Sequence, residues 1–502
     1  MILTRYNLKK IDATDLVVPD EDIFDLPEKV LQFGTGVLLR GLPDYFIDKA
    51  NREGIFNGRI AIIKSTDAGS TTEFDRQDGL YTLYIKGVAN GKEVNEQIIN
   101  SSINRVLSAT KHWESILKAA HNPHLQVIIS NTTEVGIQLV QDDITRYPPV
   151  SFPGKLLALL YERYKAFGGS DKSGLVIIPT ELIVDNGKKL ESIVLELAHL
   201  NKLEPAFMDW LESCNNFCNS LVDRIVPGKP QPALQDKLEK QSGYEDNLRI
   251  IAEPYCLWAI EGNEKIKSVL SFSQVHSGVV ITPDIEIYRE LKLRLLNGTH
   301  TLSCAIAYLS GFNTVKEAMD NPAFSHFLLN IMSKEIAPAI PYAIAEKVKA
   351  EFMHQVLDRF RNPNIEHQWI SISAQYSAKL KLRVLPLLLN HYKNTNTVPE
   401  NCAFGFAAFL RFMQIAPDGN GNYTGLANGK NYVVTDSNAV LFSSAWNSGN
   451  VKTVVNNILK DTTLWGTDLT QLKGFKEAVT QKLEKIMDVG TLQMLQNFDL
   501  KS

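Results

Sequence analysis

The pattern of apolar positions changes about half-way along the chain. In the first half, short, mainly apolar runs occur at residues 29–33, 59–64, 125–130 and 175–179, separated by turns and amphipathic stretches. Such runs are typical of strands buried in a parallel sheet. From about Ile285 onward, apolar residues recur with the period of a helix, for example over 342–357, 403–415 and 474–487. We therefore expect an α/β, doubly wound Rossmann-like domain over residues 1–284 and a mainly α-helical domain over 285–502.

The first apolar run leads into a turn with two glycines, Gly34-Thr35-Gly36, followed by an amphipathic stretch. Glycines at a strand-to-helix turn let backbone N–H groups approach a pyrophosphate at the positive end of the helix. Leu39 stands where a third glycine would complete the usual fingerprint, so a simple tight turn is an alternative. Asp67, after the second run, can bind a ribose and repel a 2′-phosphate, which favours NAD over NADP, or it can cap a turn.

Length, charge and cysteine content restrict the class of protein. The 502 residues are too many for one core, and the 44% apolar and 22% charged fractions are typical of globular proteins. A net charge of −4 without a Lys/Arg block argues against nucleic acid as a partner but allows a small anionic substrate. No apolar stretch has the length of a signal peptide or membrane span, so we expect a cytoplasmic protein without a membrane partner. Five cysteines without a completing His or Cys pair predict reduced thiols and no metal site.

The stretch from Lys292 to His300 combines a base, an amide and an imidazole within a helical pattern. At ~100° per residue, Asn297 lies about 140° and His300 about 80° around an α-helix from Lys292, so the three side chains can face one pocket. Arg289 falls within the same arc, but so do two leucines. A buried apolar helix with solvated ends therefore remains an alternative.

The order of Lys292, four residues, Asn297, two residues and His300 resembles the signature of the mannitol dehydrogenase family, the polyol-specific long-chain dehydrogenases. The resemblance implies that Lys292 is the general acid and base, while Asn297 and His300 hold the oxygen of the reacting carbonyl or carbinol. It also implies NAD as cofactor. The expected cofactor contacts are Gly34, Gly36 and Asp67, to which the family pattern adds Arg40, Thr133 and Glu134.

The resemblance extends to residues that meet the substrate. Asp223 matches a family residue that lines the substrate site. In the second half, the segment from Arg359 to Pro363 and the later basic cluster of Lys379, Lys381 and Arg383 match a family pattern in which basic side chains meet the substrate. Lys379 and Arg383, four residues apart, can converge on one carboxylate. At least one member of the cluster is expected to lie on a solvated helix face.

Two departures from the mannitol enzymes narrow the expected substrate. Leu182 stands where they have an Asn that polarises the reacting oxygen, and Arg289, itself able to attract an anion, stands where they have a proton-relaying Glu. Both positions are similar to the hexuronate branch of the family. The resemblance therefore implies NAD-dependent reduction of a small keto-uronate, tagaturonate first, in a cleft between the domains of a monomer or weak homo-oligomer. Fructuronate or mannitol specificity is a close alternative, and an inactive nucleotide sensor is a distant one.

Overall fold

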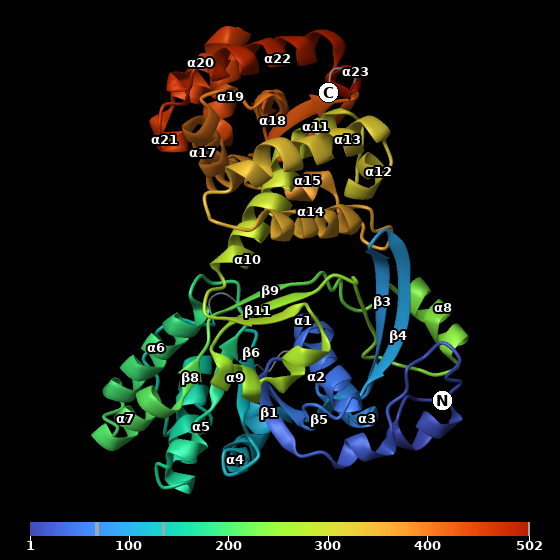
Figure 1. The fold of residues 1–502 in the computed structure, drawn as a ribbon, viewed down its shortest axis with the longest axis vertical. Helices are drawn as coiled ribbons and strands as arrows, with labels where there is room; N and C mark the ends of the chain where they lie inside the picture. Colours follow the sequence, from blue (N-terminus) through green and yellow to red (C-terminus); the bar gives the residue numbers. More distant parts are fainter. Residues whose placement is uncertain (66–69, 133–135, 500–502) are drawn as a thin grey trace. The chain divides into compact units, whose positions relative to one another are not determined.

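The chain folds as two compact units. The computed structural model describes residues 1–65, 70–132 and 136–499. The first unit comprises Met1–Gly87 and Glu93–Ile285, and the second comprises Val88–Lys92 and Glu286–Ser502 (Figure 1). The first unit is α/β and the second is mainly helical, which confirms the predicted fold class.

The first unit is organised around a parallel sheet with strand order β5-β2-β1-β6-β7-β8. Its strands are β1 (Glu28–Phe33), β2 (Arg59–Lys64), β5 (Ile103–Ser108), β6 (Val127–Ser130), β7 (Val176–Pro179) and β8 (Asn216–Phe217). Neighbouring residues of one strand pack into different cores: Val30 joins the apolar cluster that includes Phe46, and Leu31 joins the cluster that includes Leu156. Both faces of the sheet are therefore covered, which is why its central strands read as continuous apolar runs.

Helices cover the two faces of this sheet. They include α2 (Pro43–Arg52), α4 (Ala109–Ala119), α5 (Phe152–Ala166), α6 (Asn186–Leu200) and α7 (Pro205–Cys214) (Figure 1). Local sequence determines where α5 begins, because the Ser151 hydroxyl accepts a hydrogen bond from the Gly154 N–H (2.9 Å) and Pro153 occupies the first turn.

Two smaller sheets complete the first unit. One has the order β10-β3-β4 and the other β12-β11-β9. Their strands are β3 (Tyr81–Ala89), β4 (Lys92–Asn100), β9 (Ser220–Asp223), β10 (Ile250–Ala252), β11 (Leu257–Glu261) and β12 (Val279–Thr282).

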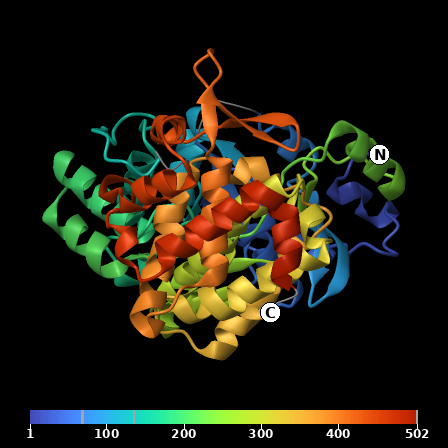
Figure 2. The ribbon, with the colours of Figure 1, turned by 90° about the horizontal axis from the view of Figure 1, so that it is seen from above.

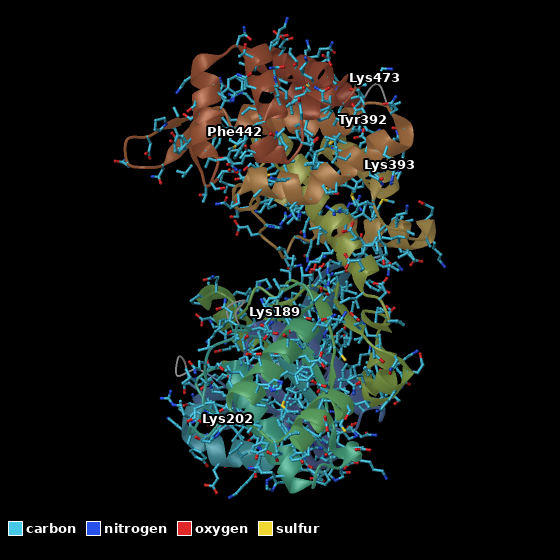
Figure 3. The ribbon with its side chains drawn as sticks, turned by 90° about the vertical axis from the view of Figure 1, so that its left-hand side faces the viewer. Lys189, Lys202, Tyr392, Lys393, Phe442 and Lys473 are labelled. Carbon is cyan, nitrogen blue, oxygen red and sulfur yellow. The ribbon has the colours of Figure 1, made fainter. Side chains whose placement is uncertain are left out.

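The second unit begins with one unbroken helical run. It consists of α10 (Glu286–Leu291), the π-helix η5 (Lys292–Gly298) and α11 (Thr299–Leu309). Further helices are α14 (Glu346–Phe360), α15 (Trp369–Ile372), α16 (Tyr376–Lys379), the π-helix η8 (Leu380–Val384), α17 (Leu385–Thr395), α18 (Glu400–Phe412) and α22 (Phe475–Val489). The central helix α18 packs against both α11 and α22. The Tyr392 hydroxyl donates to the Lys473 carbonyl (3.0 Å), which joins α17 to the turn before α22 (Figure 3).

The second unit also contains a small antiparallel sheet that the sequence pattern did not predict. Its strands are β13 (Ile415–Pro417), β14 (Tyr423–Ala427) and β15 (Lys430–Val434), and Figure 2 shows the β14–β15 hairpin in orange. Alternating glycines and asparagines over residues 418–429 predict a flexible surface loop, but Tyr423–Ala427 form the strand β14. Gly425 lies in this strand because the Tyr432 ring packs over it, and an added Cβ would come within 2.3 Å of that ring. Glycine is needed at this position because the Tyr432 ring of the neighbouring strand occupies the space of a side chain. Sequence composition alone cannot separate such a glycine from a glycine in a loop.

Candidate active site

Lys292 and Asn297 lie in a π-helix, not in the α-helix that the periodicity predicted. In a π-helix the backbone hydrogen bonds join residues i and i+5, so positions 292 and 297 are one turn apart. The angle of about 140° expected for an α-helix therefore does not apply. The wider turn brings positions 292 and 297 toward the same face, and short π-helical segments are frequent at functional sites.

A buried guanidinium ties this π-helix to a second one. Arg294 pairs with Glu290 one turn earlier, with 2.9 Å between Nε and Oε2. The same guanidinium donates to the carbonyl oxygens of Leu382 (2.7 Å) and Arg383 (3.0 Å) in η8. The segment that carries Lys292 and the segment that carries Arg383 are thus fastened together through Arg294. The two hydrogen bonds to Leu382 and Arg383 join segments almost ninety residues apart, so the sequence pattern does not predict them.

One hydroxyl, that of Thr301, connects the candidate residues of the two π-helices. It donates to the Asn297 carbonyl (2.7 Å) and accepts from the Arg383 guanidinium (3.3 Å). The Tyr376 hydroxyl donates to the Thr301 carbonyl (2.8 Å) and accepts from the Ala305 N–H (3.0 Å). These bonds hold the start of α11 against α16 and η8, so Asn297 and Arg383 belong to one network.

His300 is enclosed by three rings. The imidazole is 8% exposed and stacks on Phe360, with ring centroids 4.1 Å apart and planes at 13°. His367 and Trp369 stand nearly perpendicular to it at 5.0 and 5.9 Å. Its Nε2 is buried and has no hydrogen-bond partner within the part of the chain that the structure describes. Since buried polar atoms are normally paired, this nitrogen is available to a ligand.

The charged groups that shift the His300 pKa are all basic side chains. Burial lowers its pKa well below the usual value, and His367, Arg359, Arg383 and Lys379 act in the same direction. The imidazole is therefore neutral at pH 7, with one nitrogen able to donate and the other able to accept a hydrogen bond. Arg359 on α14, Lys379 on α16 and Arg383 on η8 are here called the cationic cluster. No carboxylate of the described residues is among the groups that shift the His300 pKa.

The predicted basic residues differ in their surroundings. The Lys379 ammonium donates to the Ile372 carbonyl (2.8 Å), and burial, with Arg383 beside it, lowers its pKa. Burial also lowers the pKa of the partly buried Arg383. Lys381 is exposed, with its ammonium 3.3 Å from the Thr463 carbonyl, and is the solvated member of the predicted basic group. Arg289 forms an ion pair with Glu286 on the same helix, so its charge is compensated locally.

In the first unit, the glycine turn follows β1 as the sequence pattern predicted. Gly34 has φ +134, and an added Cβ would lie 3.0 Å from both the Asn131 carbonyl oxygen and a Leu39 methyl group. Gly36 is the N-cap of the short helix α1 (Val37–Gly41), where no side chain caps the backbone. No heavy atom comes within 4 Å of its Cβ position. This open backbone at the carboxyl end of β1 fits the close approach that a pyrophosphate requires.

The other predicted cofactor residues are placed unevenly. Arg40 is buried, donates to the Leu248 carbonyl, and accepts at its own carbonyl from the Tyr81 hydroxyl (2.7 Å). Burial lowers the pKa of its guanidinium. Asp67, Thr133 and Glu134 lie outside the described residues. Their roles in cofactor binding, like that of Arg40, stay predictions.

Two family models match this chain in succession. The mannitol dehydrogenase Rossmann domain matches residues 28–272, and the mannitol dehydrogenase C-terminal domain matches residues 284–487. The chain belongs to the mannitol dehydrogenase family. The resemblance inferred from the Lys292, Asn297 and His300 spacing is thereby confirmed.

Two curated relatives are altronate oxidoreductases. The altronate oxidoreductase of Bacillus subtilis (strain 168) is 37% identical over 477 residues, which cover 94% of this chain and 95% of that protein. The altronate oxidoreductase of Pectobacterium carotovorum subsp. carotovorum (strain PC1) is 36% identical over 473 residues, covering 92% and 95%. The chain is accordingly an oxidoreductase acting on CH–OH groups, a dehydrogenase of the polyol and sugar-acid class.

Two solved structures share the fold. A ternary complex of Pseudomonas fluorescens mannitol 2-dehydrogenase with NAD and D-mannitol aligns over 100% of both chains with a TM-score of 0.67 and 21% identity. A D-sorbitol dehydrogenase in substrate-free form aligns over 98% of this chain and 99% of its own, with a TM-score of 0.77 and 20% identity.

Leu182, which stands where the mannitol enzymes have an Asn, lies in the turn between β7 and α6. Leu182 follows β7 and is 64% exposed. Asn186, four residues on, is buried and donates to the carbonyls of Pro179 (3.0 Å) and Ser220 (3.1 Å). Asn186 therefore fastens the β7–α6 turn to β9. Asp223, at the end of β9, is buried and pairs in register with Leu257, and its role at the substrate stays a prediction.

Sequence reasoning missed Glu181, which holds together polar residues at the carboxyl end of the parallel sheet. Its buried carboxylate accepts hydrogen bonds from the Thr132 N–H (2.7 Å), the Thr132 hydroxyl (2.9 Å) and the Ser130 hydroxyl (3.1 Å). It thereby holds the backbone just after β6. A usable signal was present, because polar residues follow both β6 and β7, and the carboxyl ends of adjacent parallel strands meet at one edge.

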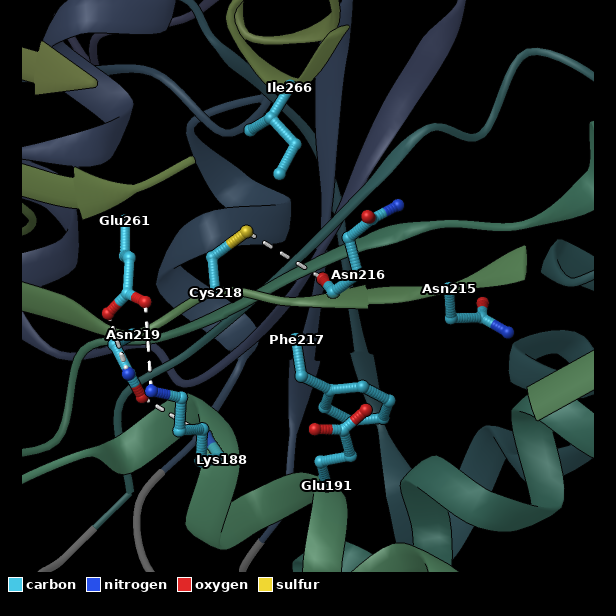
Figure 4. A pocket seen from close by; sticks show the side chains of 9 residues that line it. All are labelled: Lys188, Glu191, Asn215, Asn216, Phe217, Cys218, Asn219, Glu261 and Ile266. Carbon is cyan, nitrogen blue, oxygen red and sulfur yellow. Dashed lines mark hydrogen bonds and ion pairs between the residues drawn. The ribbon is translucent and has the colours of Figure 1, made fainter. Parts of the chain in front are cut away.

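A separate pocket of ≈ 220 Å³ lies beside the edge strand β8 (Figure 4). Its lining residues are Lys188, Glu191, Asn215, Asn216, Phe217, Cys218, Asn219, Glu261 and Ile266. Glu261 accepts from the Asn219 amide (2.8 Å) and pairs with Lys188 (3.7 Å). Burial raises the pKa of the Cys218 thiol to about 12, so it is an unreactive thiol at neutral pH. No predicted site residue lines this pocket.

The described residues contain no candidate metal site and no candidate membrane span. Within residues 1–65, 70–132 and 136–499, no group of three or more His, Cys, Asp and Glu side chains could hold a metal ion. No helix in the same ranges has both the length and the apolar character that crossing a bilayer requires.

Proposed function

We propose that this chain is an NAD-dependent reductase of a keto-uronate, converting D-tagaturonate to D-altronate reversibly in hexuronate catabolism. The observation that supports it most directly is the cationic cluster around the neutral His300, whose Nε2 has no partner among the described residues. Positive charges gather around this buried imidazole, and an anionic substrate would meet them through charge-assisted hydrogen bonds. The altronate oxidoreductase relatives point to the same substrate class.

Each candidate side chain has a defined task in this proposal. The Lys292 ammonium donates a proton to the substrate oxygen as the ketone becomes an alkoxide, and neutral Lys292 takes that proton back in the reverse reaction. The amide of Asn297 and the imidazole of His300 donate hydrogen bonds to the same oxygen and stabilise its developing charge. NADH, when bound, supplies the hydride to the ketone carbon.

The first unit would hold the cofactor. Open backbone at Gly36 and the tight turn at Gly34 fit a pyrophosphate, and Asp67 favours NAD over NADP. Arg40, Thr133 and Glu134 are the further proposed contacts. Asp223, Arg289, Lys379 and Arg383 are the proposed substrate contacts. We expect a cytoplasmic enzyme that is a monomer or weak homo-oligomer.

A substrate panel tests this function. NADH oxidation is followed with tagaturonate, fructuronate and fructose in parallel, and we expect tagaturonate to be reduced with the highest kcat/KM. A preference for fructuronate would make the protein the epimeric uronate reductase, and a preference for neutral fructose would overturn the uronate assignment. NADH binding without oxidation of any of the three would favour the nucleotide sensor.

A matched pair of lysines sharpens the panel. Lys379→Met removes one charge-assisted contact to the carboxylate, worth about 1.5–3 kcal/mol, so KM for tagaturonate should rise about ten- to a hundredfold. Fructose kinetics should change far less, because that substrate lacks a carboxylate. Lys381→Met, two residues away and exposed, serves as the control and should leave both unchanged. Equal KM values for Lys379→Met and the wild type would remove Lys379 from the proposed site.

A further inference from the structure

His367 contacts the candidate catalytic imidazole of His300, and the proposed reaction assigns no task to it. Its ring centroid lies 5.0 Å from that of His300, with the planes at 85°. The backbone of His367 is held on both sides, because its N–H donates to the Ile365 carbonyl (3.0 Å) and its carbonyl accepts from the Val315 N–H (2.9 Å). The ring is thus presented to His300 from a fixed stretch of backbone.

The three rings around His300 differ in character. Trp369 is fully buried and packs against Phe324 (5.9 Å between ring centroids), and Phe360 is buried as well. Both walls are aromatic carbon for the most part and carry no titratable group. His367 is half-buried and titratable. Of the three walls, it is the one whose charge can change with pH.

Among the described residues, the charged groups that shift the pKa values of the two imidazoles are cations. Arg359 on α14 and Lys379 on α16 face both rings, and Arg383 on η8 also acts on His300. Burial, followed by these cations, lowers the pKa of both imidazoles. His300 is buried and His367 is half-buried, so the charged form of His367 is the better solvated and His367 gains a proton first as the pH falls. That proton would add charge to a surface that is already cationic.

We propose that His367 is a positioning residue for His300. Its neutral ring holds the His300 imidazole at the angle at which the unpartnered Nε2 can meet the substrate oxygen. Protonation of His367 ends this hold, since a charged ring is repelled by Arg359 and Lys379 and is better solvated in water. The proposal rests on the proposed function of His300, and it predicts an acid limit of activity that belongs to His367.

Three variants test the kinetic consequence. Edge-to-face ring contacts are worth about 0.5–1.5 kcal/mol, so His367→Ala should lower kcat about two- to tenfold while NADH affinity stays unchanged. His367→Phe retains an aromatic wall without a titratable group. It should recover most of kcat near neutral pH and keep its activity at pH values where the wild type loses it.

The control is His391→Ala. His391 on α17 is also half-buried, also has a pKa lowered by burial, and contacts Thr397 (3.3 Å) rather than His300. This variant should retain the wild-type kcat and pH profile. The proposal is overturned if His367→Ala keeps the wild-type kcat, or if His367→Phe keeps the wild-type acid limit.

A measurement without substrate separates this proposal from the proposed function. Protein labelled with ¹³C at histidine Cε1 is titrated by NMR in the wild type, in His367→Ala and in His391→Ala. We expect the His300 resonance to move in His367→Ala and to stay in place in His391→Ala. If it moves in a protein that reduces no keto-uronate, positioning stands while the proposed function fails. If it stays in His367→Ala, positioning fails whatever the substrate is.

Discussion

The glycine turn of the first unit and the surroundings of His300 in the second unit are built by different means. At the turn, the controlling contacts lie close in sequence or in adjacent strands: Gly34 adopts φ +134 directly after β1 and packs against Leu39. Around His300, the controlling groups come from α14, α15, η8 and the segment before α15, up to 83 residues away at Arg383. A cofactor turn can thus be specified locally, whereas this imidazole depends on tertiary packing.

The largest effect should come from cutting the link between the two π-helices. Arg294→Met leaves Glu290 buried and unpaired and frees two carbonyls in η8, which we expect to cost about 3–5 kcal/mol of unfolding free energy. The urea midpoint of the second unit, followed by the fluorescence of its tryptophans, measures this loss. The double variant Glu290→Gln/Arg294→Met should recover part of it. An unchanged midpoint in Arg294→Met would show that the site does not depend on this link.

A smaller but more specific effect is expected at Lys292. Lys292→Ala should lower turnover by at least ~10²-fold, because general acid–base catalysis is lost. NADH affinity, measured by fluorescence titration, should stay nearly unchanged because the proposed cofactor residues are untouched. If turnover survives, Lys292 is not the acid and base. If NADH affinity falls in parallel, Lys292 also contributes to cofactor binding, and the candidate site of the second unit does not act independently of the glycine turn.

The smallest effect concerns a carboxyl group beneath the glycine turn. The fully buried Asp44 lies 3.5 Å from the Gln32 amide nitrogen, which also reaches the Gly34 carbonyl (3.4 Å). Asp44 Oδ1 and Gln32 Oε1 both lack a partner among the described residues. Burial raises the Asp44 pKa to about 8, and a protonated carboxyl could donate to Gln32 and satisfy both oxygens.

This carboxyl makes a signed prediction about pH. The folded protein keeps the Asp44 proton up to about pH 8, whereas the unfolded chain releases it near the ordinary value of 3.8. The free energy of unfolding therefore falls as pH rises between these values and levels off above pH 8. Asp44→Asn should flatten this fall and raise stability at pH 8 by about 1–3 kcal/mol, as measured by urea unfolding across pH.

Asp48, one turn later, provides the matched control. Its carboxylate accepts from the Ser101 N–H (2.7 Å) and the Ser101 hydroxyl (2.8 Å) and pairs with Arg52 (2.7 Å). Asp48→Asn should therefore destabilise the protein at the same pH at which Asp44→Asn stabilises it. If both substitutions destabilise the protein equally at pH 8, Asp44 is ionised in the folded state.

The errors of prediction fall where tertiary contacts override local pattern. Residues 292–298 are helical as predicted, but they form a π-helix and not an α-helix. Over so short a segment, apolar periodicity cannot separate helices whose hydrogen bonds span four residues from helices whose hydrogen bonds span five. The β14 segment was predicted as a loop because it contains Gly425, which is a glycine because the Tyr432 ring of the neighbouring strand leaves no space for a side chain. Glu181 was passed over because its partners, Ser130 and Thr132, lie about fifty residues away.

The amino-acid sequence alone determined the class of fold, four of the six strands of the parallel sheet, the glycine turn and the family signature of Lys292, Asn297 and His300. These features depend on burial periodicity, on backbone freedom at glycine and on residue spacing, all of which are written along the chain. Only the tertiary structure decided that Lys292 and Asn297 share a π-helical face, that Arg359 and His367 join the surroundings of His300, and that Arg40 points into the interior. Those outcomes depend on desolvation and on charges brought together from distant segments, and such energies exist only once the chain has folded.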